Sequence, residues 1–176
     1  EMCIRDRISI AHYPAVQQAY VLTACGASVG DGYGPKLVTA TPMTAEELRQ
    51  RNPVIAVPGA HTTALATTKL LLGSDVQWEA IAFETIAAAV RDGAYAAGVV
   101  IHEGQLTFAH IGLHLVEDLG AWWQRTHGLP LPLGGNAAKR DLDQRGGEGT
   151  LVELAHILRR SVEHAMANRS TSLAWA

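Results

Sequence analysis

The chain has 176 residues, of which 48% are hydrophobic and 18% are charged, and its net charge is −3. This is the composition of a globular protein, and the high apolar content with the small net charge excludes general disorder. A pI of 6.2 leaves no basic surplus for binding the phosphates of a nucleic acid. No apolar run approaches the roughly 20 residues of a membrane helix. Two cysteines are too few for a disulfide framework or a four-cysteine zinc site.

The amino-terminal part opens with a stretch that does not resemble the rest of the chain. We interpret residues 1–7 as a non-native leader. Cys3 lies in this leader, which leaves Cys25 as the native cysteine. A short apolar run follows at 19–23. The glycine-rich stretch 26–34 then leads into residues 34–40, which alternate as a strand does.

Two helices with a strand between them come next. Thr44 and Glu47 have the spacing of a capping box, and the helix that they begin must end before Pro53. Residues 54–57 form a continuous apolar run, which is typical of a strand buried on both faces. Residues 62–72 then predict a helix that ends at the following glycine.

The rest of the chain continues this alternation. We predict strands at 76–83, 97–101 and 113–116 (the last two buried on both faces), helices at 84–91, 120–126 and 150–167, an extended Leu-Pro segment at 129–133, and loosely ordered residues from 168 onward. Strands and helices joined by short connections indicate an α/β architecture with a mainly parallel sheet. Such sheets bind ligands beyond the carboxyl ends of their strands, so the residues after each buried strand are the functional candidates.

Two of these strand ends carry suitable side chains. Thr62 and Thr63 begin the helix after strand 54–57, and helix-start amides with threonine hydroxyls suit a carboxylate or a phosphate. Either threonine alone would equally serve as a plain N-cap. His102 follows strand 97–101, where a neutral imidazole is suited to proton abstraction, while a structural histidine held by hydrogen bonds is the other interpretation. The second histidine that a zinc-binding helix would need is missing four residues on.

Two glycine-containing segments are further candidates. The stretch 26–34 lacks the lysine and the spacing of a nucleotide-binding loop, and it precedes a strand rather than a helix. We interpret it as a closely packed turn or as a backbone approach to a ligand, with Ser28 as a candidate contact. Residues 134–136 either line a crevice or form a plain turn.

Four motifs occur in a fixed order along the chain. They are GASVGDGYGP at 26–35, VPG at 57–59 with TTA at 62–64, IHEGQLT at 101–107, and GLPLPLGGN at 128–136. In this order and spacing, residues 8–167 resemble the 1,4-dihydroxy-6-naphthoate synthase family of the futalosine route to menaquinone.

This resemblance implies a fold like that of the type II periplasmic binding proteins, with two α/β lobes and the substrate in the cleft between them. It implies a bacterial, cytoplasmic lyase without metal or organic cofactor that converts cyclic dehypoxanthine futalosine to 1,4-dihydroxy-6-naphthoate and dihydroxyacetone. The family's general base corresponds to His102, and its substrate contacts correspond to Thr63, Ala64 and the region of Ser9. The expected partner is therefore a small molecule, not a nucleic acid or a membrane.

The resemblance also divides the chain. We expect residues 8–41 and 131–176 to belong to one lobe and residues 42–130 to the other. The family begins with a further stretch that supplies the first strands of the first lobe. A chain shortened at both ends would expose sheet edges and apolar surface, so we expect it to be poorly soluble or inactive when expressed alone.

Two alternatives share the same fold. A solute-binding protein would bind without reacting, and it would need no positioned base such as His102. Chorismate dehydratase of the same pathway is the other alternative, against which the motifs at 101–105 and 129–136 argue.

Overall fold

A computed structural model describes residues 5–175 and divides the chain into two compact units. Of the described residues, 5–28 and 134–175 form unit 1, and the continuous segment Val29–Leu133 forms unit 2. The chain passes between the units inside two strands, β3 (Ser28–Gly30) and β9 (Leu131–Lys139). Unit 2 therefore begins earlier than the lobe expected at 42–130, and it takes in the strand predicted at 34–40.

Unit 2 is built on a five-stranded sheet with the order β6-β5-β7-β4-β8. These strands are β4 (Lys36–Thr39), β5 (Ile55–Val57), β6 (Trp78–Ala80), β7 (Ala97–Val100) and β8 (His114–Asp118). β5 runs parallel to β6 and β7, whereas β4 runs antiparallel to both β7 and β8. Four strands thus point the same way and β4 alone is reversed. The amino end of β4 therefore lies at the same end of the sheet as the carboxyl ends of the other four strands.

Local signals begin and end the helices of unit 2. In α2 (Ala45–Arg51), Thr44 and Glu47 form the expected capping box, and Asn52 ends the helix in the left-handed conformation. In α3 (Thr63–Leu72) the Thr62 hydroxyl oxygen accepts from the Leu65 amide at 3.2 Å. These signals lie within a few residues of each helix end, which is why the sequence predicts both helices.

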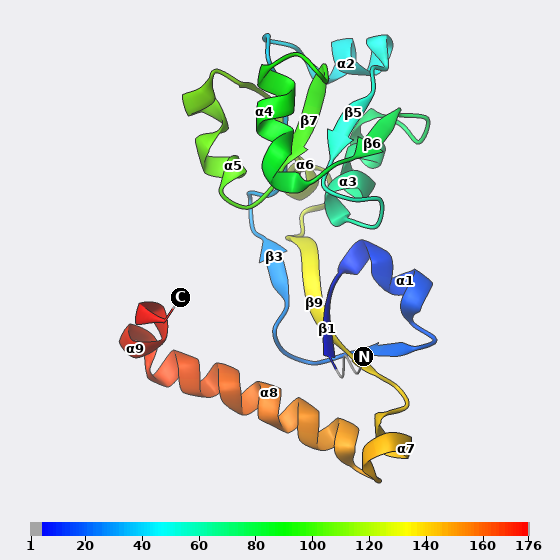
Figure 1. The fold of residues 1–176 in the computed structure, drawn as a ribbon, viewed down its shortest axis with the longest axis vertical. Coiled ribbons are helices and arrows are strands. Elements are labelled where there is room, and N and C mark those ends of the chain that lie inside the picture. The colour runs from blue at the N-terminus through cyan, green and yellow to red at the C-terminus, as the bar shows by residue number, and fades with distance from the viewer. Residues whose placement is uncertain (1–4, 176) are drawn as a thin grey trace. The chain divides into compact units, whose positions relative to one another are not determined.

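Apolar side chains on both faces of this sheet form two cores. Successive strand residues point to opposite faces, so Leu37 joins the core under α2, α3 and α6 (Leu119–His127), while Val38 joins the core under α4 (Ile86–Arg91). All four residues of β7 are buried, as the sequence predicts. Figure 1 shows α4 lying across β7, with α3 beside β5 and β6.

The remaining elements of unit 2 are short. They are η2 (Phe83–Thr85), α5 (Gly104–Thr107) and η3 (Phe108–Ile111). The prediction that residues 113–116 form a doubly buried strand is wrong: β8 lies at the edge of the sheet, and Leu115 is 47% exposed. An edge strand has a neighbour on one side only, and the local sequence cannot show which strand becomes the edge.

Unit 1 is organised around β9, which pairs antiparallel with both β1 (Arg5–Ser9) and β2 (Tyr20–Leu22). Between β1 and β2 lie η1 (Ile10–His12) and α1 (Tyr13–Val16). Residues 134–136 lie inside β9, so the interpretation of this segment as a turn is wrong. β1 starts within the stretch that sequence analysis set aside as a leader, and Cys3 lies outside the described residues.

After β9 the chain continues as α7 (Leu142–Gly146), α8 (Thr150–Ala167) and α9 (Arg169–Ala174). The prediction of loose order from residue 168 is wrong, because α9 forms there. The apolar stripe of α8 is half-buried at Leu151, Leu154 and Leu158, but its continuation is exposed at Val162 and Met166. The apolar stripe of this helix thus changes from half-buried to exposed along its length.

Candidate functional site

The candidate site in unit 2 lies at one edge of its sheet. The paired residues Ile55 and Ala97 place β5 and β7 side by side and parallel, so the segments that follow both strands leave at the same edge. Lys36, the first residue of β4, pairs with Val100, the last of β7. The loop before β4 therefore reaches this edge as well.

The segment after β5 supplies the start of α3. Thr62 is the N-cap, and its hydroxyl also donates to the Gly59 carbonyl at 2.8 Å, so the plain capping interpretation holds for this residue. Thr63 is 7% exposed, and its hydroxyl donates to the Leu133 carbonyl at 3.1 Å. Ala64 is buried. The backbone hydrogen bond from the Ala66 amide to the Thr62 carbonyl begins the α3 ladder, and Ala64 lies before that donor. The first four amides of an α-helix have no acceptor within the helix ladder, and the Ala64 amide is one of them.

The segment after β7 supplies His102. Its side chain is exposed, and its ring packs on Phe83 with the centroids 5.0 Å apart and the planes tilted by 54°. Its backbone φ is +51°, in the left-handed region that residues with a Cβ seldom adopt. The imidazole is therefore directed by an unusual backbone conformation and by an aromatic neighbour that follows β6.

An ion pair that is not predicted from the sequence lies at this edge. The Lys36 ammonium donates to the Asp118 carboxylate, and the two side chains are only 15% and 16% exposed. The same carboxylate caps α6 by accepting from the amides of Gly120 and Ala121 at 3.0 and 3.1 Å. The contact between Phe83 and His102 is not predicted from the sequence either. In both cases the residues come from separate parts of the chain, and only the pairing of the strands brings them together.

The serine candidates belong to unit 1. Ser9 ends β1 opposite Gly134 of β9, and Ser28 begins β3. The Ser28 hydroxyl would lie 3.1 Å from a Cβ added at Gly134, so both serines flank the same glycine. The structure thus groups the candidates into Thr62, Thr63, Ala64 and His102 in unit 2, and Ser9 with Ser28 in unit 1.

Asn136 also lies in unit 1 and holds the glycine-rich segment in place. Its carbonyl accepts from the Thr23 hydroxyl at 3.1 Å, and its side-chain amide lies 3.4 Å from the Cys25 carbonyl. Gly26 has a φ of +81°, and the Asn136 amide fills the space that a Cβ would need there. Within unit 1 these contacts support the interpretation of this segment as a closely packed turn.

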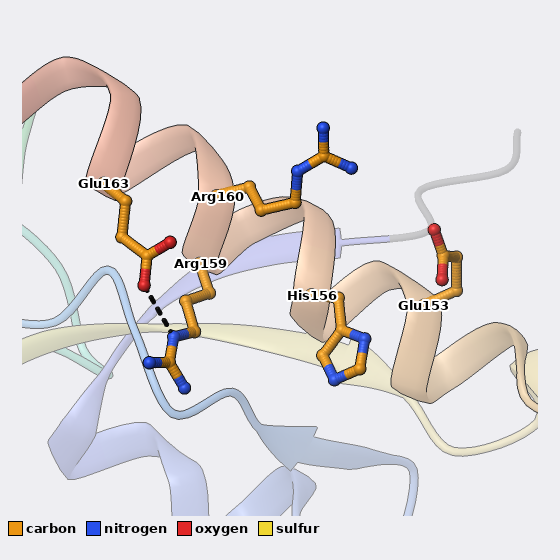
Figure 2. Close-up of a pocket in the computed structure, with 5 residues that line it drawn as sticks. All are labelled: Glu153, His156, Arg159, Arg160 and Glu163. Carbon is orange, nitrogen blue, oxygen red and sulfur yellow. Dashed lines mark hydrogen bonds and ion pairs between the residues drawn. The ribbon is translucent and has the colours of Figure 1, made fainter. Parts of the chain in front are cut away.

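A surface hollow elsewhere on unit 1 contains none of these candidates. It has a volume of about 370 Å³ and is lined by Glu153, His156, Arg159, Arg160 and Glu163. Figure 2 shows all five side chains coming from the single helix α8, with Arg159 paired to Glu163 at 2.8 Å. This hydrogen bond raises the pKa of Arg159. Because one helix forms the whole lining, the hollow lacks the convergent walls of a substrate site.

Two kinds of feature are absent from residues 5–175. Within that range no group of three or more His, Cys, Asp or Glu side chains is arranged to hold a metal ion. No helix there combines the length and the apolar character needed to cross a membrane.

The family model for menaquinone biosynthesis matches residues 6–176. The chain belongs to this menaquinone biosynthesis family. Two relatives named 1,4-dihydroxy-6-naphtoate synthase support the assignment. The one from Thermus thermophilus is 40% identical over 95% of this chain and 58% of its own length, and the one from Streptomyces coelicolor is 37% identical over 90% and 55%. The chain thus spans somewhat more than half the length of these relatives.

Solved structures of similar proteins establish the fold of this family member. A crystal structure of a protein from Archaeoglobus fulgidus has a TM-score of 0.81 and 37% identity, and it covers 98% of this chain and 61% of its own. An alkanesulfonate-binding protein from Xanthomonas axonopodis has a TM-score of 0.63 with 13% identity over 93% of this chain and 56% of its own. The second likeness shows the fold alone, and the expected periplasmic-binding-protein-like architecture is confirmed.

Proposed function

We propose that this member of the menaquinone biosynthesis family contributes to a carbon–carbon lyase that converts cyclic dehypoxanthine futalosine to 1,4-dihydroxy-6-naphthoate and dihydroxyacetone. One observation carries the proposal. The segment with His102 leaves β7 at the same sheet edge at which α3 begins after β5. A base and a set of helix-start amides on adjacent strand ends suit a substrate that must lose a proton and carry negative charge.

The proposed chemistry divides between these two groups. A neutral imidazole accepts a proton from the substrate near pH 7, which makes His102 the proposed general base. The Ala64 amide and the positive end of the α3 dipole stabilise the substrate carboxylate or a developing oxyanion. Thr63, whose hydroxyl already donates to Leu133, offers the lone pairs of its oxygen as acceptors.

The test is turnover of cyclic dehypoxanthine futalosine by the complete gene product, followed by release of the naphthoate. We expect His102→Asn to lower kcat by about 10²- to 10⁴-fold, the usual contribution of a general base, while substrate binding measured by calorimetry is retained. The matched control is His114→Asn, which changes an exposed histidine on the edge strand of the same unit and should leave kcat unchanged. Near-normal turnover by His102→Asn would refute the assignment of the base.

The serines complete the proposal. We include Ser9 and Ser28 as substrate contacts from unit 1, and we expect Ser9→Ala and Ser28→Ala to raise KM more than they lower kcat. We also place the reaction in the cytoplasm, which cell fractionation with an antibody to the chain would test. Binding of the futalosine compound without turnover would favour a solute-binding protein, and turnover of chorismate instead would favour the dehydratase.

A further inference from the structure

Gln105, the second residue of α5, forms hydrogen bonds with the backbone of His102. With its side-chain amide oriented to satisfy both neighbours, the oxygen accepts from the His102 amide at 3.2 Å. The backbone amide of Gln105 donates to the His102 carbonyl at 3.1 Å. One residue therefore binds both polar backbone groups of the proposed base.

His102 needs such support because of its backbone conformation. A left-handed φ is unfavourable for a residue with a Cβ, so it persists only where neighbouring groups favour it. Phe83 contacts the ring of His102, whereas Gln105 holds its backbone. If the Gln105 side chain is lost, the turn is expected to relax toward other conformations, and the imidazole moves with it.

The other end of the Gln105 side chain is attached to a fixed point. Its amide nitrogen donates to the Gly34 carbonyl at 2.7 Å. Gly34 is buried against Gly120, so closely that a Cβ added at Gly34 would lie 2.9 Å from the Gly120 backbone. The Leu119 amide also donates to the Pro35 carbonyl at 2.9 Å. Buried backbone packing of this density leaves the acceptor little freedom to move.

We propose that Gln105 is a positioning residue that fixes the direction of the His102 imidazole by tying the turn after β7 to the loop before β4. The antiparallel pairing of Lys36 with Val100 explains why this bridge is possible, because it brings the residues before β4 beside those after β7. The inference rests on the proposed function, in which His102 is the base. It adds a residue that acts on the reaction without touching the substrate.

The test compares Gln105→Leu with the unchanged protein, using the complete gene product and cyclic dehypoxanthine futalosine. Leucine keeps the volume of the side chain and removes both of its hydrogen bonds. We expect kcat to fall by about 10- to 100-fold with KM changed less than about threefold, because misplacement of a catalytic group affects the chemical step. We expect the His102 amide to exchange hydrogen about tenfold faster, because its acceptor is gone.

Two further variants separate positioning from general stability. Gln105→Glu keeps an acceptor for the His102 amide but loses the donor to Gly34, so its kcat should fall between those of the unchanged protein and Gln105→Leu. Gln124→Leu is the matched control. It removes a glutamine whose amide donates to Asp31 at 3.0 Å in the same unit, and kcat should remain unchanged.

The possible results distinguish this inference from the proposed function. Gln105→Leu with full kcat and unchanged exchange at His102 would overturn the positioning role alone. An equal loss of kcat in Gln105→Leu and Gln124→Leu, matched by an equal loss of folded protein, would also overturn it. Turnover by His102→Asn would instead overturn the assignment of the base, and the positioning role would fall with it.

Discussion

Replacing Gly98 with alanine tests the packing of β7, the strand that precedes His102. Gly98 lies in the middle of β7 and pairs with Ala56 of β5. A Cβ added at Gly98 would lie 2.6 Å from Ile86 Cγ2 and 2.7 Å from Val90 Cγ2. Both of these α4 side chains are fully buried, so neither methyl group can turn out into solvent.

The magnitude follows from this geometry. Carbon atoms in contact are separated by about 3.5 Å, so the two methyl groups must retreat by roughly 0.8–0.9 Å. Overpacking of a core costs about 1–3 kcal/mol, and two blocked positions favour the upper part of that range. Alanine recovers about 0.4–1 kcal/mol by restricting the unfolded chain. We therefore expect the free energy of unfolding to fall by about 2 kcal/mol, and Tm to fall by about 4–8 °C.

Urea denaturation followed by circular dichroism measures this loss. Val90→Ala removes one of the obstructing methyl groups, so Gly98→Ala should cost about 1 kcal/mol less in that background than in the unchanged protein. Gly135→Ala is the control, because a Cβ there would meet only the terminal methyl groups of Ile10 and Leu22, at 3.2 and 3.4 Å. If Gly98→Ala were as stable as the unchanged protein, the close packing of α4 on β7 would be refuted.

Two further predictions concern stability. Asp118→Ala removes both the cap of α6 and the partner of the partly buried Lys36, so we expect it to lower the free energy of unfolding by about 3 kcal/mol. Lys36→Met keeps the cap, so we expect it to lower the free energy of unfolding by only about 1 kcal/mol. Urea titration measures both, and a larger effect of Lys36→Met would contradict the reasoning. Hydrogen bonds from the Thr44 backbone amide and then from its hydroxyl hold the pKa of Glu47 below its ordinary value of 4.5. Because the lower pKa belongs to the folded state, this stabilisation is complete above the unfolded-state pKa and is lost as pH falls through the folded-state value. The difference in free energy of unfolding between the unchanged protein and Glu47→Ala should therefore shrink as pH falls through that range. A difference that widens as pH falls would contradict the capping box.

The elements that the sequence predicts well are those with signals near their ends. The capping box at Thr44, the N-cap at Thr62 and the apolar run at 54–57 each act within a few residues, and α2, α3 and β5 form at those positions. Residues 113–116 carry a mostly apolar run that also led to the prediction of a buried strand, yet β8 lies at the sheet edge. Burial depends on what packs against a strand, and the strand's own residues do not specify its neighbours.

The candidate site shows the same division. His102 can be selected from sequence because it lies just after a buried apolar strand, and Thr62 and Thr63 because they begin the helix that follows another such strand. Gln105 also lies in a recognisable motif, but its contact with Gly34 spans more than 70 residues of chain. The antiparallel pairing of β4 with β7 creates that contact, and the direction of β4 is not written in its four residues.

The sequence by itself thus determined the ends of α2 and α3, the buried strands β5 and β7, and the family resemblance, and it selects His102 as the histidine proposed to act as the base. The tertiary structure decided which strand runs in reverse, which strand is the edge, and which residues meet at the carboxyl ends of β5 and β7. The physical reason is that capping and periodicity depend on neighbours along the chain, whereas strand order and burial depend on neighbours in space.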